Sequence, residues 1–294
     1  CPRSFPIGKA YKHIKQLNEN LTYSEKMGAY LSSYAGTTTK DAIKEVRQDG
    51  GIVTSLLEYM MKNDIVDAII AVKHSDKLWK PVPVIIDNVD DLYQTAGTKY
   101  ANSPSLNIVD KAMNYERVAF VGVPCMLKAL EKGNLFPAGS VFFQNIKYKI
   151  GLFCMESFSY DEIIKLVEEQ FNEDINNLTK MNIDAGKFII NLKEGEEKKV
   201  PLKDVQKYAR DTCHYCDDLT SFYADISVGS IGAPGGNSAV VIRSKAGEEI
   251  YQKAIKDGII ESKKLSEVKP GKFLVEKIGG IKQKKCKSVE LPEE

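Results

Sequence analysis

The sequence of 294 residues has almost no net charge, no long apolar run and no signal-peptide pattern. Its 41 basic and 40 acidic side chains leave a formal charge of +1, so no overall field favours nucleic acid or a membrane surface as a partner. No apolar stretch approaches the roughly 20 residues that a membrane-spanning helix needs. Because a basic start followed by an apolar core and a cleavage site is also missing, we expect the protein in the cytoplasm.

Cysteine is scarce, but the spacing of the six cysteines is informative. In a cytosolic protein of this size, thiols indicate metal binding or catalysis rather than a disulfide framework. Cys213 and Cys216 form a Cys-x-x-Cys pair, which is typical of half a zinc site, two ligands of an iron–sulfur cluster or a thioredoxin-like disulfide. Two purely structural thiols are a fourth interpretation. Zinc and cubane sites usually take four ligands, so further thiols are needed.

Strands alternate with helices along the chain, which predicts an α/β fold. We expect a mixed, largely parallel sheet flanked by helices, with a smaller α+β insertion at residues 172–203. Strands are expected at residues 67–73, 82–86, 117–123, 147–153 and 239–243. Helices are expected at residues 11–17, 52–62, 105–115, 126–132, 160–171 and 245–256. The small, polar residues 30–39 are expected to form a loop.

Two further cysteines each follow an apolar strand. Cys125 comes directly after Pro124 at the end of the strand at 117–123, and Cys154 follows the strand at 147–153. Open α/β sheets bind their ligands at the carboxyl ends of strands, so these thiols are placed at a ligand-binding edge. With Cys213 and Cys216 they make four, the number that a cubane cluster needs. Cys286 lies in a basic segment that we expect to be solvated, and no function is assigned to it.

Three glycine-containing turns are candidate cofactor sites. Gly50 and Gly51 precede a helix, an arrangement typical of an anion site and equally of a plain loop-to-helix junction. Residues 97–100 supply a turn, a hydroxyl, a cation and an aromatic ring, which suit a phosphate or ring system, or an exposed turn. A third glycine-rich turn follows the apolar strand after Cys216, where a ligand can approach the backbone closely.

Seven stretches occur in the order in which they occur in the coenzyme F420 hydrogenase/dehydrogenase beta-subunit family, which the sequence resembles from about residue 44 to residue 277. They are Arg47-Gln-Asp-Gly-Gly-Ile-Val-Thr54, Trp79-Lys-Pro81, Ala96-Gly-Thr-Lys-Tyr100, Gly122-Val-Pro-Cys125, Gly151-Leu-Phe-Cys-Met-Glu-Ser157, Lys180-Met-Asn-Ile-Asp184 with Gly186-Lys-Phe188, and Cys213-His-Tyr-Cys216 through Ala224-Asp-Ile-Ser-Val-Gly-Ser-Ile-Gly-Ala-Pro234. The order of all seven makes the resemblance specific.

The resemblance implies a flavoprotein with FAD and a 4Fe-4S cluster that exchanges a hydride with coenzyme F420 and passes single electrons to an iron–sulfur partner domain or subunit. Members of the family serve F420-reducing hydrogenase, formate dehydrogenase and F420 dehydrogenase, and a related domain forms the N-terminal half of F420-dependent sulfite reductase. In this scheme residues 44–277 form the oxidoreductase domain and residues 278–294 a basic tail. Residues 1–43 form an extension after an upstream ferredoxin-like segment, because Cys1-Pro2 resembles the end of a ferredoxin cluster motif.

The resemblance also assigns site residues. The cluster ligands are expected to be Cys125, Cys154, Cys213 and Cys216. The expected contacts of FAD are Gln48, Asp49, Gly50, Gly51, Thr54, Thr98, Lys99, Tyr100, Gly229, Ser230 and Gly232. Lys80 and Lys99 are expected to contact the acidic tail of F420. Pro124 is expected to bind a cofactor, and Glu156 the flavin or a helix end. Two alternatives remain, a non-catalytic iron–sulfur or zinc electron-relay or docking subunit, and a thiol–disulfide oxidoreductase that uses Cys213 and Cys216.

Overall fold

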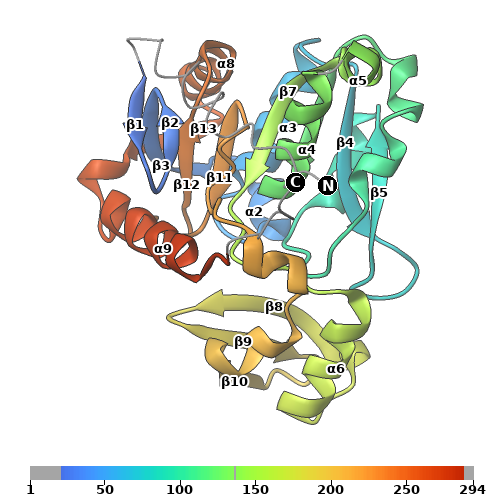
Figure 1. Ribbon diagram of the computed structural model, residues 1–294, viewed down its shortest axis with the longest axis vertical. Coiled ribbons are helices and arrows are strands. Elements are labelled where there is room, and N and C mark those ends of the chain that lie inside the picture. The colour runs from blue at the N-terminus through green and yellow to red at the C-terminus, as the bar shows by residue number, and fades with distance from the viewer. Residues whose placement is uncertain (1–20, 136, 288–294) are drawn as a thin grey trace, which may run out of the picture.

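The computed structural model describes residues 21–135 and 137–287, so the helix predicted at residues 11–17 lies outside the described residues. The larger of its two lobes is built on an eight-stranded sheet in the order β13-β3-β12-β11-β7-β6-β4-β5 (Figure 1). Its strands are β3 (Ser32–Thr38), β4 (Ala68–His74), β5 (Pro81–Ile86), β6 (Val118–Gly122), β7 (Ile146–Leu152), β11 (Ile226–Gly229), β12 (Ser238–Ile242) and β13 (Ile260–Lys264).

The centre of the sheet is parallel and its margins are antiparallel. Strands β4, β6, β7 and β11 pair in parallel, whereas β5, β12 and β13 run against their neighbours. Because β12 is antiparallel to both β11 and β3, strand β3 runs in the same direction as the parallel group. The carboxyl ends of five strands therefore meet at one edge, and the predicted mixed, largely parallel α/β fold is confirmed.

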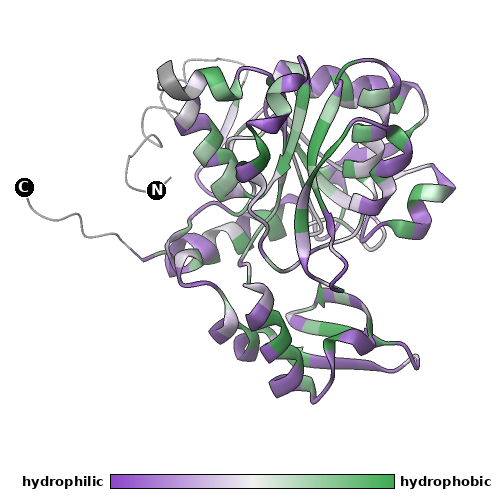
Figure 2. Ribbon diagram, turned by 90° about the vertical axis from the view of Figure 1, so that its right-hand side faces the viewer, coloured by the Kyte–Doolittle hydropathy of each residue, from purple (hydrophilic) through white to green (hydrophobic). Residues whose placement is uncertain are grey.

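Helices cover both faces of this sheet, and the alternation of buried residues along each strand explains why. In β4, Ile69 and Ala71 pack under α3 (Ile52–Lys62), while Ala68 and Ile70 face α4 (Pro124–Asn134). The strands of the sheet form a green, apolar layer within a mostly purple exterior (Figure 2). The remaining helices of the larger lobe are α2 (Asp41–Val46), α5 (Pro137–Phe143), α8 (Lys245–Lys256) and α9 (Gly271–Lys285), with the 3-10 helices η1 (Val89–Thr95), η2 (Ser105–Ile108), η3 (Lys111–Asn114), η6 (Asp211–Tyr215) and η7 (Leu265–Glu267).

The smaller lobe is α+β and lies beyond the carboxyl edge of the main sheet (Figure 1), and its elements begin at residue 160 and end at residue 208, outside the bounds predicted for the insertion, 172–203. Its core includes Leu166 and Phe171 from a helix and Phe188 and Ile190 from a strand. Its elements are α6 (Tyr160–Phe171), η4 (Ile175–Asn177), β8 (Leu178–Asp184), β9 (Lys187–Leu192), β10 (Glu197–Pro201), α7 (Leu202–Val205) and η5 (Gln206–Tyr208). Because this lobe covers the edge where five strands end, ligands bound there would contact both lobes.

Three predictions of local structure were wrong. Residues 30–39 are not a loop, since Tyr30 ends β2 (Gly28–Tyr30), which pairs with β1 (Thr22–Ser24), and β3 follows as a strand of the main sheet, between β13 and β12. Residues 105–115 form η2 and η3 rather than one helix. The basic segment is not a solvated tail up to residue 285, because α9 packs against the sheet through Val275. Within the described residues, no helix is both long and apolar enough to cross a membrane.

Candidate functional site

Four thiols from three separate chain segments line one cavity of about 340 Å³. Cys125 lies in the first turn of α4 directly after β6, and Cys154 follows the end of β7. Cys213 lies in η6 and Cys216 caps it. The backbone joins these segments, since the amide of Cys154 donates a 2.9 Å hydrogen bond to the carbonyl of Leu219. The predicted cysteines are thus brought together at the carboxyl edge of the sheet.

The electrostatics of Cys154 show how closely the thiols interact. Burial, with a smaller contribution from the three other cysteines, raises the pKa of the Cys154 thiol to about 12 against the opposing charge of Lys282. Lys282 is 4% exposed, and its Nζ donates a hydrogen bond to the carbonyl of Cys154. Burial alone would lower the pKa of Lys282, but Cys154, Cys216 and Asp218 outweigh it and raise that pKa. A buried cation therefore lies among the four thiols.

The donor set suits a cluster better than a single metal ion. Among the described residues, no group of three or more His, Cys, Asp or Glu side chains is placed to hold one ion. A tetrahedral zinc site with Zn–S bonds of about 2.3 Å needs its four ligands to converge on one point. A cubane distributes four thiolates over several iron atoms, so its ligands surround a larger volume. Four cysteines around one cavity, with no histidine in its lining, fit this second arrangement.

Unpartnered polar atoms in the wall also indicate a polar occupant. Ser103 Oγ, Ser105 Oγ and Asp218 Oδ1 are buried without a hydrogen-bond partner in the part of the chain that the structure describes, and all three residues line the cavity. Buried polar groups rarely lack a partner in folded proteins. Burial raises the pKa of Asp218 to about 6, although the Phe222 amide and Arg243 favour its charged form.

The loop from Gln48 to Gly51 lies at the same edge, between the ends of β3 and β12. Gly50 donates to Ser238 Oγ at 3.0 Å and accepts from the Thr38 amide at 2.8 Å. A Cβ on Gly50 would lie 2.4 Å from the Gly36 carbonyl oxygen, so only glycine fits this approach. Gly51 follows with φ of 71° as the N-cap of α3, and Thr54 is buried in the first turn of that helix. The loop is held closely by backbone contacts.

Two side chains of this loop reach toward the smaller lobe. Gln48 Nε2 donates to Asn182 Oδ1 at 3.1 Å and to the Met181 carbonyl at 3.2 Å. Burial raises the pKa of Asp49, against the opposing charges of Lys180 and Arg47. Burial also raises the pKa of Tyr100, with Asp49 adding to the shift, and its ring packs 5.3 Å from that of Phe188. The structure therefore brings the predicted residues Gln48, Asp49 and Tyr100 to one junction between the lobes.

The predicted lysines and Thr98 are placed differently. Lys99 Nζ donates to the carbonyls of Thr95, Ala96 and Gly97, at 2.6, 2.5 and 3.1 Å, and burial lowers its pKa to about 8. Its ammonium is thus engaged by the end of η1. Thr98 and Lys80 are exposed, and Lys80 Nζ lies 5.7 Å from the centre of the Tyr160 ring.

The remaining predicted residues lie nearer to α9 or to the sheet. A Cβ on Gly232 would lie 2.5 Å from Val275, and one on Gly229 would lie 2.3 Å from the Phe153 ring, so close packing explains both glycines. Ser230 is exposed. Pro124 is buried at the start of α4 and lines the thiol cavity. Burial raises the pKa of Glu156, and the charges of Lys285, His214 and Lys282 oppose that shift.

Two family models, which describe the N-terminal and C-terminal parts of the coenzyme F420 hydrogenase/dehydrogenase beta chain, match most of the sequence. The N-terminal model matches residues 33–110, and the C-terminal model matches residues 115–268. The chain belongs to the coenzyme F420 hydrogenase/dehydrogenase beta-subunit family. The predicted resemblance is confirmed, and the members of this family are components of F420-linked oxidoreductases.

Individual members of the family match over nearly the whole chain. The coenzyme F420 hydrogenase subunit beta of Methanosarcina barkeri is 36% identical over 90% of this chain and 92% of its own length. The F subunit of the F(420)H(2) dehydrogenase of Methanosarcina mazei is 35% identical over 97% of this chain and 76% of its own length. A chain in the solved F420-reducing [NiFe] hydrogenase complex from Methanosarcina barkeri superposes with a TM-score of 0.85 at 36% identity, covering 90% of this chain and 92% of that chain.

The structure adds two features to this F420 hydrogenase/dehydrogenase beta-type chain that the sequence patterns did not reveal. The first is Lys282 in α9, a helix that begins after the last residue matched by the family models. Its signal in the sequence is spacing, since Gly271, Val275, Gly279 and Lys282 share one buried helix face.

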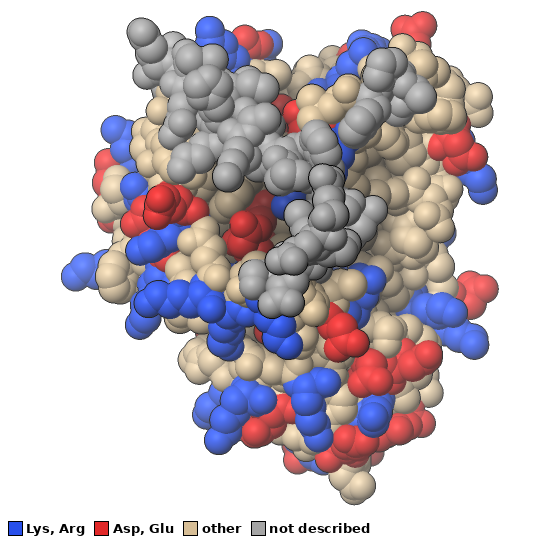
Figure 3. All heavy atoms as spheres, viewed as in Figure 1, with Lys and Arg blue, Asp and Glu red and all other residues tan. Residues whose placement is uncertain are grey.

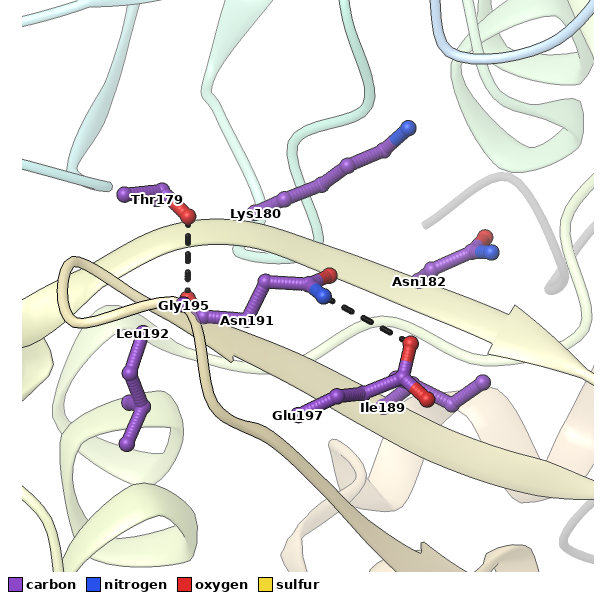
Figure 4. Close-up of a pocket in the computed structure, with 8 residues that line it drawn as sticks. All are labelled: Thr179, Lys180, Asn182, Ile189, Asn191, Leu192, Gly195 and Glu197. Atoms are coloured by element: carbon purple, nitrogen blue, oxygen red, sulfur yellow. Dashed lines mark hydrogen bonds between the residues drawn. The ribbon is translucent and has the colours of Figure 1, made fainter.

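The second feature is a polar cavity of about 520 Å³ on the sheet of the smaller lobe (Figure 4). Thr179 Oγ1 donates to the Asn191 carbonyl at 3.1 Å, and Asn191 Nδ2 donates to Glu197 Oε2 at 3.5 Å. Lys180 and Asn182 project from β8 beside it, and these are the residues that interact with Asp49 and Gln48. The cavity therefore adjoins the junction between the lobes.

Proposed function

We propose that this chain is a cytoplasmic, FAD-containing oxidoreductase subunit or domain that exchanges a hydride with coenzyme F420 and passes single electrons to an iron–sulfur partner through a 4Fe-4S cluster. The observation that carries the proposal is the convergence of four thiols on one cavity at the carboxyl edge of the sheet. Membership of a family of F420-linked redox subunits supports the same conclusion.

The flavin would supply the chemistry that links a two-electron carrier to a one-electron carrier, since it accepts electrons in pairs and releases them singly. The residues of this chain bind and orient. Cys125, Cys154, Cys213 and Cys216 would hold the cluster as thiolates, and the buried ammonium of Lys282 would offset part of their charge. The side chains of Gln48 and Asp49 would offer polar contacts to a flavin at the same edge, and the hydrogen bonds of Gly50 to Ser238 and Thr38 hold the loop that carries them.

The first test measures iron in four single cysteine-to-alanine variants, at positions 125, 154, 213 and 216, purified without oxygen. Each variant should lose the cluster, about four irons per chain, because a cubane with three protein ligands is poorly held. Cys286→Ala is the matched control, since Cys286 does not line the cavity and should retain all the iron. A variant that keeps its iron would show that its cysteine is not a ligand.

The second test is an anaerobic visible spectrum of the intact protein before and after addition of reduced F420. We expect flavin bands and a broad iron–sulfur shoulder, both bleached by the reductant. An iron-containing protein without flavin would instead favour the electron-relay or docking subunit. A colourless protein that contains zinc would contradict the proposal. A protein that lacks iron but contains a disulfide that F420 does not reduce would favour the thiol–disulfide alternative.

A further inference from the structure

We infer that Lys282 sets the electron affinity of the thiol-bound cluster by fixing one positive charge among its ligands. This inference rests on the proposed function, because it requires a redox group in the cavity lined by the four cysteines. It concerns a residue beyond the part of the chain that the family models match, which ends at residue 268. Lys282 is thus a positioning and electrostatic residue rather than a ligand.

The contacts of Lys282 are specific. The residue lines the thiol cavity and is 4% exposed, so its charge is shielded from solvent. Its Nζ donates to the carbonyl of Cys154 and also interacts with the Cys216 side chain. The ammonium therefore lies between ligands contributed by two segments that are more than fifty residues apart in the sequence.

The backbone of α9 determines where this lysine points. A Cβ on Gly279 would lie 2.6 Å from the carbonyl oxygen of Lys26, so the helix approaches the β1–β2 turn as closely as glycine allows. Gln283 Nε2 donates to the Glu25 carbonyl at 2.6 Å, and the Lys287 amide donates to the His214 carbonyl at 2.8 Å. The helix is held on both sides of Lys282, and its end is fixed to the segment that carries Cys213 and Cys216.

Other lysines of α9 provide the contrast. Lys284 and Lys285 are exposed, and basic side chains gather on the surface near α9, above the smaller lobe (Figure 3). Charges in solvent are screened within about 8–10 Å at physiological salt, whereas a buried charge is screened much less. Among the lysines in the last turn of α9, Lys282 alone is buried against the thiols, so it should have by far the largest effect on the cluster.

The sign of the effect follows from the charge. Each electron that the cluster accepts adds one negative charge, and a buried cation nearby stabilises the reduced form more than the oxidised form. Removal of the cation should therefore make the cluster harder to reduce. A role limited to anchoring α9 would change stability or iron content but would not by itself shift the midpoint potential in this direction.

The experiment compares the full-length protein with Lys282→Met, Lys282→Gln, Lys282→Arg and Lys284→Met. Iron and acid-labile sulfide are measured first, and the midpoint potential is then determined by an anaerobic titration monitored by electron paramagnetic resonance. Lys282→Gln can still donate to the Cys154 carbonyl, so it separates the hydrogen bond from the charge. Lys282→Arg keeps the charge, and Lys284→Met removes an exposed charge from the same helix.

We expect Lys282→Met and Lys282→Gln to retain iron and to show an equilibrium constant for one-electron reduction that is at least tenfold lower, which corresponds to a midpoint about 59 mV more negative. Lys282→Arg and Lys284→Met should stay within about threefold of the parent constant, since a factor of three is well below that shift. Full iron with an unshifted potential in both neutral variants would overturn the inference. Loss of iron from both neutral variants but not from Lys282→Arg would also overturn it, in favour of a role in assembly. Absence of iron from the unmodified protein would refute the proposed function itself.

Discussion

Replacing Arg243 with methionine should destabilise the protein more than any exposed substitution. The guanidinium is 1% exposed, and it donates to five acceptors at 2.7–2.9 Å. The acceptors are Ser227 Oγ, Thr220 Oγ1 and the carbonyls of Met27, Ala29 and Thr220. Arg243 therefore connects β12 to the β1–β2 turn and to the chain that follows Cys216.

The expected loss can be bounded from these contacts. A buried acceptor left without a donor costs about 1–3 kcal/mol, so five would give roughly 5–15 kcal/mol if they were independent. They are not independent, because the two hydroxyls can rotate to new partners and because methionine removes a buried charge. Breaking a buried hydrogen-bond network is among the most destabilising single substitutions, and losses above about 4–5 kcal/mol are exceptional, so we expect a loss of about 3–5 kcal/mol. At about 2–4 °C per kcal/mol, the melting temperature should fall by roughly 6–20 °C.

Equilibrium urea unfolding and thermal melting would measure this loss. Arg117→Met is the matched control, because the side chain of Arg117 is 44% exposed and pairs with Asp67 at the surface. Exposed ion pairs contribute about 0–1 kcal/mol, so the control should remain near the parent protein. If Arg243→Met lost no more stability than Arg117→Met, the buried network around Arg243 would not be a major source of stability.

Two further predictions address the junction between the lobes. Gly50→Ala should lose about 1–3 kcal/mol of stability, because the added methyl group would overlap the Gly36 carbonyl. The variant should also bind FAD more weakly in fluorescence titrations. Unchanged FAD binding would exclude the Gly50 loop from the flavin site. Burial lowers the pKa of Lys99 to about 8, so the cost of burying its charge is fully present below pH 8. This cost disappears as the pH rises from 8 towards the unfolded value of about 10.4, so the stability of the parent protein relative to Lys99→Met should rise over that range. Urea unfolding at pH 7 and pH 9.5 measures the difference in free energy of unfolding between the parent protein and Lys99→Met. Equal differences at the two pH values would show that burial does not lower the pKa of Lys99. An unchanged flavin content and F420 Michaelis constant in Lys99→Met would exclude Lys99 from both cofactor sites.

Local signals predicted the helices whose ends are capped. Residues 52–62, 160–171 and 245–256 form helices as predicted, and Ser159 and Ser244 accept hydrogen bonds from the backbone as N-caps. Strand β3 could not be predicted in this way, because Ser32-Ser-Tyr-Ala-Gly-Thr-Thr38 has Ser, Ala or Gly at four of seven positions and no Val, Ile or Leu. Its place is set by distant partners, since Tyr251 and Ile52 pack directly on Gly36.

In the candidate site, too, some residues could be placed from the local sequence and others depend on contacts between distant segments. Cys125 and Cys154 could be predicted to lie together, because each follows a parallel strand and the ends of such strands share one edge. Lys282 could not, because its burial depends on how α9 packs, and the buried face of that helix has glycines where apolar residues are expected. Lys99 was predicted as a contact of FAD and of the acidic tail of F420, and the structure shows three backbone carbonyls around its ammonium.

The separation of the four thiols along the chain has a consequence for folding. Cys125, Cys154 and the Cys213–Cys216 pair lie on three segments that are joined through long stretches of polypeptide. A group bound to all of them acts as a cross-link that closes these loops, and the entropy of the unfolded chain falls accordingly. Part of the binding energy of the group then adds to the stability of the fold. Oxidative loss of the group would release the three segments together, so damage to the redox centre and exposure of the chain to proteases should coincide.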